Sequence, residues 1–166
     1  LGQFEQAVQS HERAIEIKPA HAEALNNLAT ALRETGRLEE ALAACDRALS
    51  IKPAFAQALN NRAAVLSHAG RHAEAQVDVE RAIALAPGLA TAHFNYGVIL
   101  GDLGLHDLSL TAYRHSVELD PRNSTAWNNM GYALQSLYRD EEALPCFSQA
   151  LALEPDNVEV LINQGT

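Results

Sequence analysis

The sequence predicts an all-α fold, a solenoid of stacked helix–turn–helix units, and two patterns carry this prediction. Five prolines recur at a constant interval of 34 residues along the chain: Pro19, Pro53, Pro87, Pro121 and Pro155. A period of roughly 20–50 residues without insertions is typical of a stacked repeat array. Between successive prolines, apolar residues follow the spacing of two amphipathic helices, so each interval is expected to fold as one helix pair.

The unit at residues 22–55 shows the pattern most clearly. Its first helix is expected to begin near Ala22, because the apolar residues that follow have i, i+3, i+4, i+7 spacing. This stripe consists of Leu25, Leu28, Ala29 and Leu32. Gly36 is expected to end the helix, since glycine takes the left-handed conformation without steric penalty. Glu39 and Glu40 then lie in the first turn of the second helix, where negative charge suits the helix dipole, and this helix stops before Pro53.

The later units keep the same frame of small side chains and turn glycines. One position of the second helix holds Ala41, Ala75, Ser109 and Ala143, and another holds Ala48, Ala82, Ser116 and Ala150. Small residues there should let two helices approach closely. The turn position holds Gly36, Gly70 and Gly104, and then Tyr138. The fourth turn must therefore close without an easy left-handed residue.

This unit resembles the tetratricopeptide repeat (TPR), a helix–turn–helix of the same length, and the resemblance covers the whole chain. It implies a right-handed α-solenoid and a single array over residues 1–166. The expected full repeats are 22–55, 56–89, 90–123 and 124–157, with a half repeat at 1–21 and the start of a fifth first helix at 158–166. Because both ends fall inside a repeat, we expect a longer parent protein.

Asparagine recurs with the same period in the middle of each first helix, at Asn27, Asn61, Asn95, Asn129 and Asn163. Asparagine is a poor residue for a helix interior, because its amide competes with the backbone. In the TPR family the first helices line the concave side of a superhelix. The resemblance implies that such an asparagine ladder binds the backbone of an extended peptide. The alternative is that these asparagines join adjacent repeats.

Further candidate peptide-binding residues lie on the same face. Three of them directly precede a ladder residue, namely Asn26, Asn60 and Asn128. Phe94 takes their place in another repeat, where it either contacts a ligand side chain or covers a thin part of the core. Tyr132 and Arg33 complete the set. Arg33 is the one evident cation on this face, so a carboxylate clamp for the C-terminal tails of chaperones is not expected.

Arg62 and the N-terminal segment of the chain depart from the regular pattern. Arg62 replaces the apolar Leu28, and we expect its stem to pack while its guanidinium reaches water. A cation aimed at a carboxylate of the ligand is the alternative. Residues 3–18 are expected to form the second helix of a repeat without its partner, which leaves an apolar face containing Phe4, Ala7 and Ile15 exposed.

Composition and motifs exclude several functions. The formal net charge of −9 argues against non-specific binding to nucleic acid. No apolar run approaches the roughly 18 residues of a membrane helix. Cys45 and Cys146 are expected to be free thiols, which favours a reducing compartment such as the cytoplasm. The sequence shows no metal-ligand spacing, no phosphate-binding glycine loop and no nucleophile elbow. We therefore expect no metal, no cofactor and no catalytic residue.

Three hypotheses of function remain. The first is a non-catalytic protein–protein interaction scaffold that binds an extended peptide or partner segment through the asparagine ladder. The second is the substrate-recognition segment of a larger enzyme. It follows from ALNNLATAL, AWNNMGYAL and GRLEEAL, which are similar to the TPR arrays of O-linked N-acetylglucosamine transferases and their bacterial relatives. The third is a self-assembly module in which exposed terminal helices stack on another chain.

Overall fold

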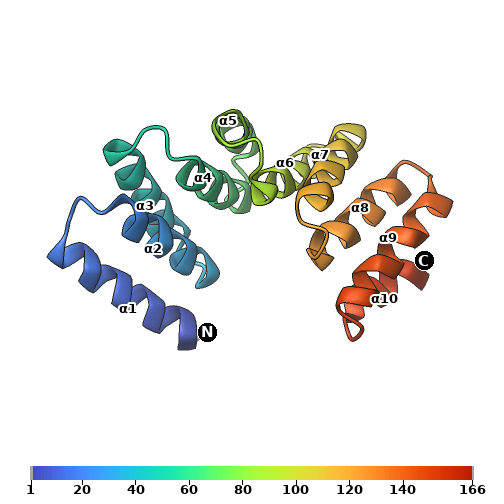
Figure 1. The fold of residues 1–166 in the computed structure, drawn as a ribbon, viewed down its shortest axis with the longest axis horizontal. Coiled ribbons are helices and arrows are strands. Elements are labelled where there is room, and N and C mark those ends of the chain that lie inside the picture. The colour runs from blue at the N-terminus through green and yellow to red at the C-terminus, as the bar shows by residue number, and fades with distance from the viewer. Residues whose placement is uncertain (1, 166) are drawn as a thin grey trace. The chain divides into compact units, whose positions relative to one another are not determined.

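The computed structural model describes residues 2–165, which form ten α-helices and no strand (Figure 1). The helices are α1 (Gly2–Ile17), α2 (Ala22–Glu34), α3 (Leu38–Ile51), α4 (Ala56–His68), α5 (His72–Leu85), α6 (Ala90–Asp102), α7 (His106–Leu119), α8 (Ser124–Ser136), α9 (Asp140–Leu153) and α10 (Val158–Gly165). The predicted all-α repeat fold is confirmed, and α2 begins at the predicted residue.

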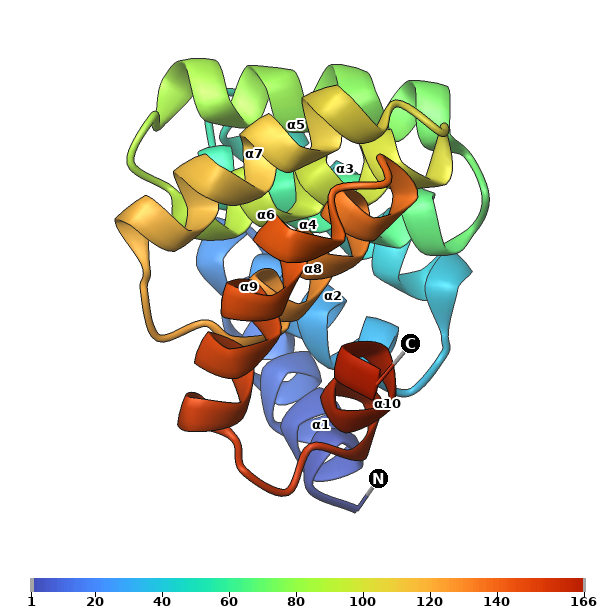
Figure 2. The same cartoon turned by 90° about the vertical axis from the view of Figure 1, so that its right-hand side faces the viewer.

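The chain divides into two compact units. The first ends at Pro87 and holds α1 to α5, while the second begins at Gly88 and holds α6 to α10. In the first unit α2 pairs with α3 and α4 with α5; in the second unit α6 pairs with α7 and α8 with α9. Helix α8 lies between α7 and α9 (Figures 1 and 2). Each pair is one predicted helix–turn–helix.

Every described turn inside a helix pair contains one residue in the left-handed conformation. The φ angle is +77° at Gly36, +73° at Gly70 and +74° at Gly104. Tyr138 occupies the equivalent place with φ of 58°. Its N–H donates to the Gln135 carbonyl at 2.8 Å, as the N–H of Gly104 does to the Gly101 carbonyl at 2.9 Å. Thus the fourth turn keeps the backbone geometry of the others, and the tyrosine itself takes the strained conformation.

Replacing Tyr138 with glycine should raise the free energy of unfolding by about 1 kcal/mol. The left-handed conformation disfavours a residue with a Cβ by roughly that amount. The Tyr138 side chain is 93% exposed, so little packing is lost. Urea denaturation followed by circular dichroism would measure the change. The matched control is Gly104→Ala, where no heavy atom lies within 4 Å of the added Cβ; this variant should lose stability by a similar amount. Equal urea midpoints for all three proteins would contradict the argument.

The small residues of the second helices are fully buried in all four repeats. The two serines among them also bind backbone carbonyls of the preceding helix. Ser109 Oγ donates to the Gly97 carbonyl at 2.7 Å, and Ser116 Oγ donates to the Ala90 carbonyl at 3.1 Å. Close approach of the paired helices is therefore confirmed, and the serine hydroxyls are buried with partners, as burial requires.

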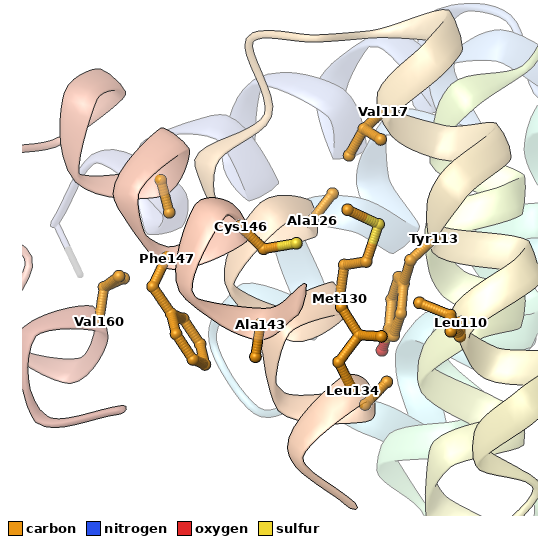
Figure 3. Packing of buried hydrophobic residues seen from close by; sticks show 12 residues of the cluster. Leu110, Tyr113, Val117, Ala126, Met130, Leu134, Ala143, Cys146, Phe147 and Val160 are labelled. Carbon is orange, nitrogen blue, oxygen red and sulfur yellow. The ribbon is translucent and has the colours of Figure 1, made fainter. Parts of the chain in front are cut away.

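The core of the second unit is built around two aromatic rings (Figure 3). Tyr113 on α7 and Phe147 on α9 are both buried. The paired first helices have Gly97 and Gly131 facing these rings, so closely that an added Cβ would lie 2.6 Å and 2.5 Å from ring carbons. In the other repeats the equivalent pairs are Ala29 with Cys45 and Ala63 with Val79. A larger second-helix residue is thus matched by a smaller one on the first helix.

Arg62 is held by carboxylates of the chain itself. Its Nε and Nη2 donate to the two carboxylate oxygens of Asp78 at 2.6 Å and 2.8 Å, and its Nη1 donates to Asp46 at 2.6 Å. These hydrogen bonds raise the pKa of Arg62 above its usual value. Both expectations for Arg62 missed these partners. The sequence does contain a signal for this ion pair, because two charged residues replace two apolar ones in the same repeat. Asp78 occupies the repeat position of Ala44, and Arg62 occupies that of Leu28.

The expected exposed face of α1 is found only in part. Phe4 is 42% exposed, but Ile15 is only 8% exposed and Val8 is buried as well. The reason is that α1 packs along α2, which covers the side of α1 that would otherwise be open. The prediction was wrong for Ile15 because it considered only the missing partner before α1 and not the helix that follows it.

Candidate functional site

Two residues of the asparagine ladder join the first helices of successive repeats. In the first unit, Asn61 Nδ2 donates to Asn26 Oδ1 at 2.8 Å and to Thr30 Oγ1 at 3.0 Å, which links α4 to α2. In the second unit, Asn163 Nδ2 donates to Asn128 Oδ1 at 3.1 Å, which links α10 to α8. The accepting asparagines are buried. At these positions the interaction is the one that the repeat-joining alternative predicts.

Asn129 on α8 makes a different contact, because Phe94 stands on α6 where an asparagine acceptor would be. A phenyl ring offers no carbonyl oxygen. The Nδ2 of Asn129 donates instead to the Tyr113 hydroxyl at 3.4 Å, a long hydrogen bond. Asn129 is half-buried, as Asn61 is. Its amide donates one long hydrogen bond, whereas the amide of Asn61 donates two shorter ones.

Phe94 itself packs into the molecule. It is half-buried against the core of the second unit, and its ring centroid lies 6.0 Å from that of Tyr113 in a tilted arrangement. This is the core-covering role that the sequence left open. Contact of Phe94 with a ligand stays a prediction.

A cavity of about 290 Å³ opens between α6, α7 and α8, next to Asn129. Its lining includes Val98, Asp102, His106, Tyr113, Asn129 and Tyr132. We call it the α6–α8 cavity. Two sequence-predicted residues, Asn129 and Tyr132, thus meet at one site, and Tyr132 is 59% exposed there.

The titratable groups that line the α6–α8 cavity are the phenols of Tyr113 and Tyr132, the carboxylate of Asp102 and the imidazole of His106. Burial raises the pKa of Tyr113 to about 12; hydrogen bonds from Asn129 and Ser109 oppose this shift, and the charge of Asp102 adds to it. The phenol therefore stays neutral near pH 7 and can both donate and accept a hydrogen bond. Among the described lining residues, Asp102 supplies the one carboxylate.

The remaining predicted residues are spread over both units. Asn27 is exposed, Asn95 is half-buried and Asn60 is buried. Arg33 donates from Nε and Nη2 to Glu34 Oε1 at 3.2 Å and 2.6 Å, so the expected cation is paired with a carboxylate of its own helix. These residues are not gathered with Asn129 and Tyr132 into the α6–α8 cavity.

Sequence reasoning missed three lining residues, namely Asp102, His106 and Tyr113. Tyr113 occupies the second-helix position that Cys45 and Val79 hold in other repeats. That position predicts a buried side chain, but it does not predict where the hydroxyl group lies. The available signal was the double change in one repeat, where Phe94 replaces asparagine and Gly97 replaces alanine. A ring that packs over Gly97 carries its hydroxyl to the edge of the core.

The described residues offer no reactive thiol, metal cluster or membrane span. Cys45 and Cys146 are free and buried, and burial raises the pKa of Cys45 to about 12 and also raises the pKa of Cys146. Both thiols therefore stay protonated at neutral pH, a poorly nucleophilic state. Residues 2–165 hold no group of three or more potential metal ligands. None of their helices is long and apolar enough to cross a membrane.

Comparisons with known proteins agree on the repeat. Tetratricopeptide repeat models match residues 1–57, 54–122 and 124–157. The structure of TTC0263, a thermophilic TPR protein of Thermus thermophilus, is similar with a TM-score of 0.85 and 20% identity, covering 99% of this chain and 90% of that one. The structure of MamA 41-end from Desulfovibrio magneticus RS-1 is similar with a TM-score of 0.75 and 22% identity, and the match covers 95% of this chain and 89% of that one. A search of curated proteins found no match.

Proposed function

The chain belongs to the tetratricopeptide repeat family, and from this premise we propose that it is a non-catalytic protein-interaction scaffold whose first helices hold an extended peptide. The α6–α8 cavity is the part of this face that we propose contacts the ligand most closely. One observation carries the proposal. Asn129 lacks the asparagine acceptor that Asn61 has on the preceding first helix, because Phe94 stands there, and it lies in a cavity beside an exposed aromatic residue, Tyr132.

The chemistry of this site suits a peptide backbone. The carboxamide of Asn129 can donate to a peptide carbonyl and accept from a peptide N–H, and the neutral Tyr113 hydroxyl can do the same. Each such bond contributes roughly 0.5–1.5 kcal/mol net, before the peptide's ordering is counted. A few bonds of this size, reduced by ordering, correspond to a dissociation constant in about the micromolar range or weaker.

The test uses a displayed library of random peptides selected on the immobilised protein. Affinities of the selected peptides would be measured by fluorescence polarisation. We expect Tyr132→Ala to weaken binding about 10-fold, because an exposed aromatic anchor contributes strongly. Asn129→Ala should weaken it by about 5-fold, the loss of one to two net hydrogen bonds.

Asn61→Ala is the matched control for Asn129→Ala. It removes two inter-repeat hydrogen bonds, so it should lower the melting temperature and leave the affinity of the folded protein unchanged. If no peptide is enriched over a blank surface, the scaffold proposal fails. It also fails if the selected peptides bind both the Asn129→Ala and Tyr132→Ala variants as tightly as the wild type.

The two alternatives from the sequence stay predictions. A substrate-recognition segment of a glycosyltransferase would use the same face, so the arrangement around Asn129 favours neither alternative over the leading proposal. The similarity to those transferases rests on the sequence motifs alone. Self-association through the terminal helices and a cytoplasmic location likewise stay predictions.

A further inference from the structure

We infer that the second unit carries another interaction surface, at the turn between α6 and α7, which binds apolar side chains of a partner segment flanked by lysine or arginine. The surface is a cavity of about 310 Å³, lined by Gly104, Leu105, His106, Asp107, Leu108 and Leu137. We call it the turn cavity. Because it is built from the turns and not from the repeated asparagines, the inference goes beyond the proposed function and does not depend on it.

Two leucines of the turn cavity replace an ion pair that the other three turns inside helix pairs contain. In each of those turns, the Nε and Nη2 of an arginine donate to both carboxylate oxygens of a glutamate three residues later, at 2.6 to 2.8 Å. The pairs are Arg37 with Glu40, Arg71 with Glu74, and Arg139 with Glu142. Leu105 and Leu108 hold these two positions in the third repeat. A polar surface pair has thus become an apolar one.

The apolar side chains at this turn are open to solvent. Leu105 is 45% exposed and Leu108 is 55% exposed, and Leu103 just before the turn is exposed as well. Leu137 lines the same cavity from the next turn, where Tyr138 combines a left-handed backbone with an almost fully exposed ring. Apolar side chains gathered on a surface mark interaction sites, and strained backbone conformations cluster where ligands bind. Both observations point to a partner at this edge of the second unit.

Negative charge surrounds the turn cavity. Asp107 belongs to its lining, while Asp140 and Glu141 lie in the first turn of α9. The hydrogen bonds with Glu142 raise the pKa of Arg139, and the charge of Asp107 adds to this rise. Arg139 therefore already serves two carboxylates, and it leaves the charge around the cavity negative.

Histidines do not reverse this charge. His106 lines the turn cavity, and its imidazole is positive only when it is protonated. Residues 88–166 hold ten aspartates and glutamates, three arginines, three histidines and no lysine. The second unit therefore remains net negative even with every histidine protonated. Such a surface attracts a basic segment and repels an acidic one.

The same charge disfavours two other occupants of the turn cavity. A second copy of the chain would bring like charges together, since each copy carries a formal net charge of −9. A membrane surface presents anionic headgroups, which carboxylates repel. A partner segment with apolar side chains between basic residues satisfies both the leucines and the carboxylates.

The experiment is an NMR titration of the full ¹⁵N-labelled chain with three capped peptides. The first has leucines between lysines, the second has the same leucines between glutamates, and the third has serines between the lysines. The leucine–lysine peptide should give saturable shifts at the amides of Gly104, Leu105 and Leu108. The other two should bind about 10-fold more weakly or not at all, because one loses the charge attraction and the other loses the apolar burial.

The double variant Leu105→Arg with Leu108→Glu restores the ion pair of the other turns without changing the net charge. It should keep the melting temperature and weaken the leucine–lysine peptide about 10-fold. Leu119→Gln is the matched control, since it removes an exposed leucine from the other end of α7 and should leave the titration unchanged. If the double variant unfolds, the three peptides still decide on the wild type. Equal binding of the lysine and glutamate peptides, or of the leucine and serine peptides, overturns the inference.

Other outcomes would also overturn it. Self-association of the wild type that the double variant abolishes, measured by light scattering, would make a second copy the occupant. Binding to anionic phospholipid vesicles that the double variant abolishes would make a membrane the occupant. Shifts clustered at Tyr132 and Ala133 would assign the peptide to the α6–α8 cavity, so that the inference falls while the proposed function stands. Conversely, shifts at the turn cavity without any enriched library peptide would leave this inference standing alone.

Discussion

Replacing Arg62 with leucine is expected to lower the free energy of unfolding by about 3 kcal/mol. The change leaves the carboxylate of Asp78 in the protein interior without its partner, since the Asp78 side chain is only 5% exposed. Removal of one member of a buried ion pair is strongly destabilising because the other charge stays desolvated. The Arg62 side chain is 26% exposed, so we expect the lower end of the usual range. Urea denaturation measures the loss.

The double variant Arg62→Leu with Asp78→Ala should recover most of that stability. It recreates the Leu28 and Ala44 pair of the preceding repeat, and an apolar pair is often as stable as a buried ion pair. Arg71→Ala is the control, because its bond to Glu74 is exposed and should contribute less than about 1 kcal/mol. If the single and double variants are equally unstable, Asp78 is not the source of the loss.

This ion pair illustrates what a periodic sequence can and cannot predict. The 34-residue interval predicts helix ends, turns and core positions, because these depend on spacing within one repeat. Partners that differ between repeats are not periodic. Arg62 shows this, since its expected environment was copied from Leu28, while its buried partner Asp78 stands where the neighbouring repeats have Ala44 and Ala112.

The candidate site was predicted in part for the same reason. Asn129 and Tyr132 were found because they lie on a repeated helix face, and the structure brings both to the α6–α8 cavity. Asp102 was missed because it lies at a helix end that varies between repeats. The bond between Asn61 and Asn26 could not be distinguished from ligand binding by sequence, since both uses require an amide at the same position.

Gly131→Ala tests whether glycine is required beside the aromatic core, and we expect it to lower the free energy of unfolding by about 2 kcal/mol. Overpacking of a core typically costs about 1–3 kcal/mol, and the added Cβ would lie 2.5 Å from a ring carbon of the fully buried Phe147. The ring has little room to move, because it packs in the cluster of Figure 3 with Val160 and Ala143. The better helix propensity of alanine, about 1 kcal/mol, offsets part of the loss.

Two further variants separate ring packing from helix propensity. Gly101→Ala, in the neighbouring first helix, places its Cβ an ordinary 3.5 Å from Ser109 Oγ and should raise stability by up to about 1 kcal/mol. Phe147→Val added to Gly131→Ala recreates the Ala63 and Val79 pair, so the two changes should be less damaging together than their sum by about 1 kcal/mol or more. Opposite signs for Gly131→Ala and Gly101→Ala require a steric cause at the ring, because propensity alone would stabilise both. Stabilisation by both substitutions would mean that Phe147 yields to the new methyl group and that glycine is not needed there.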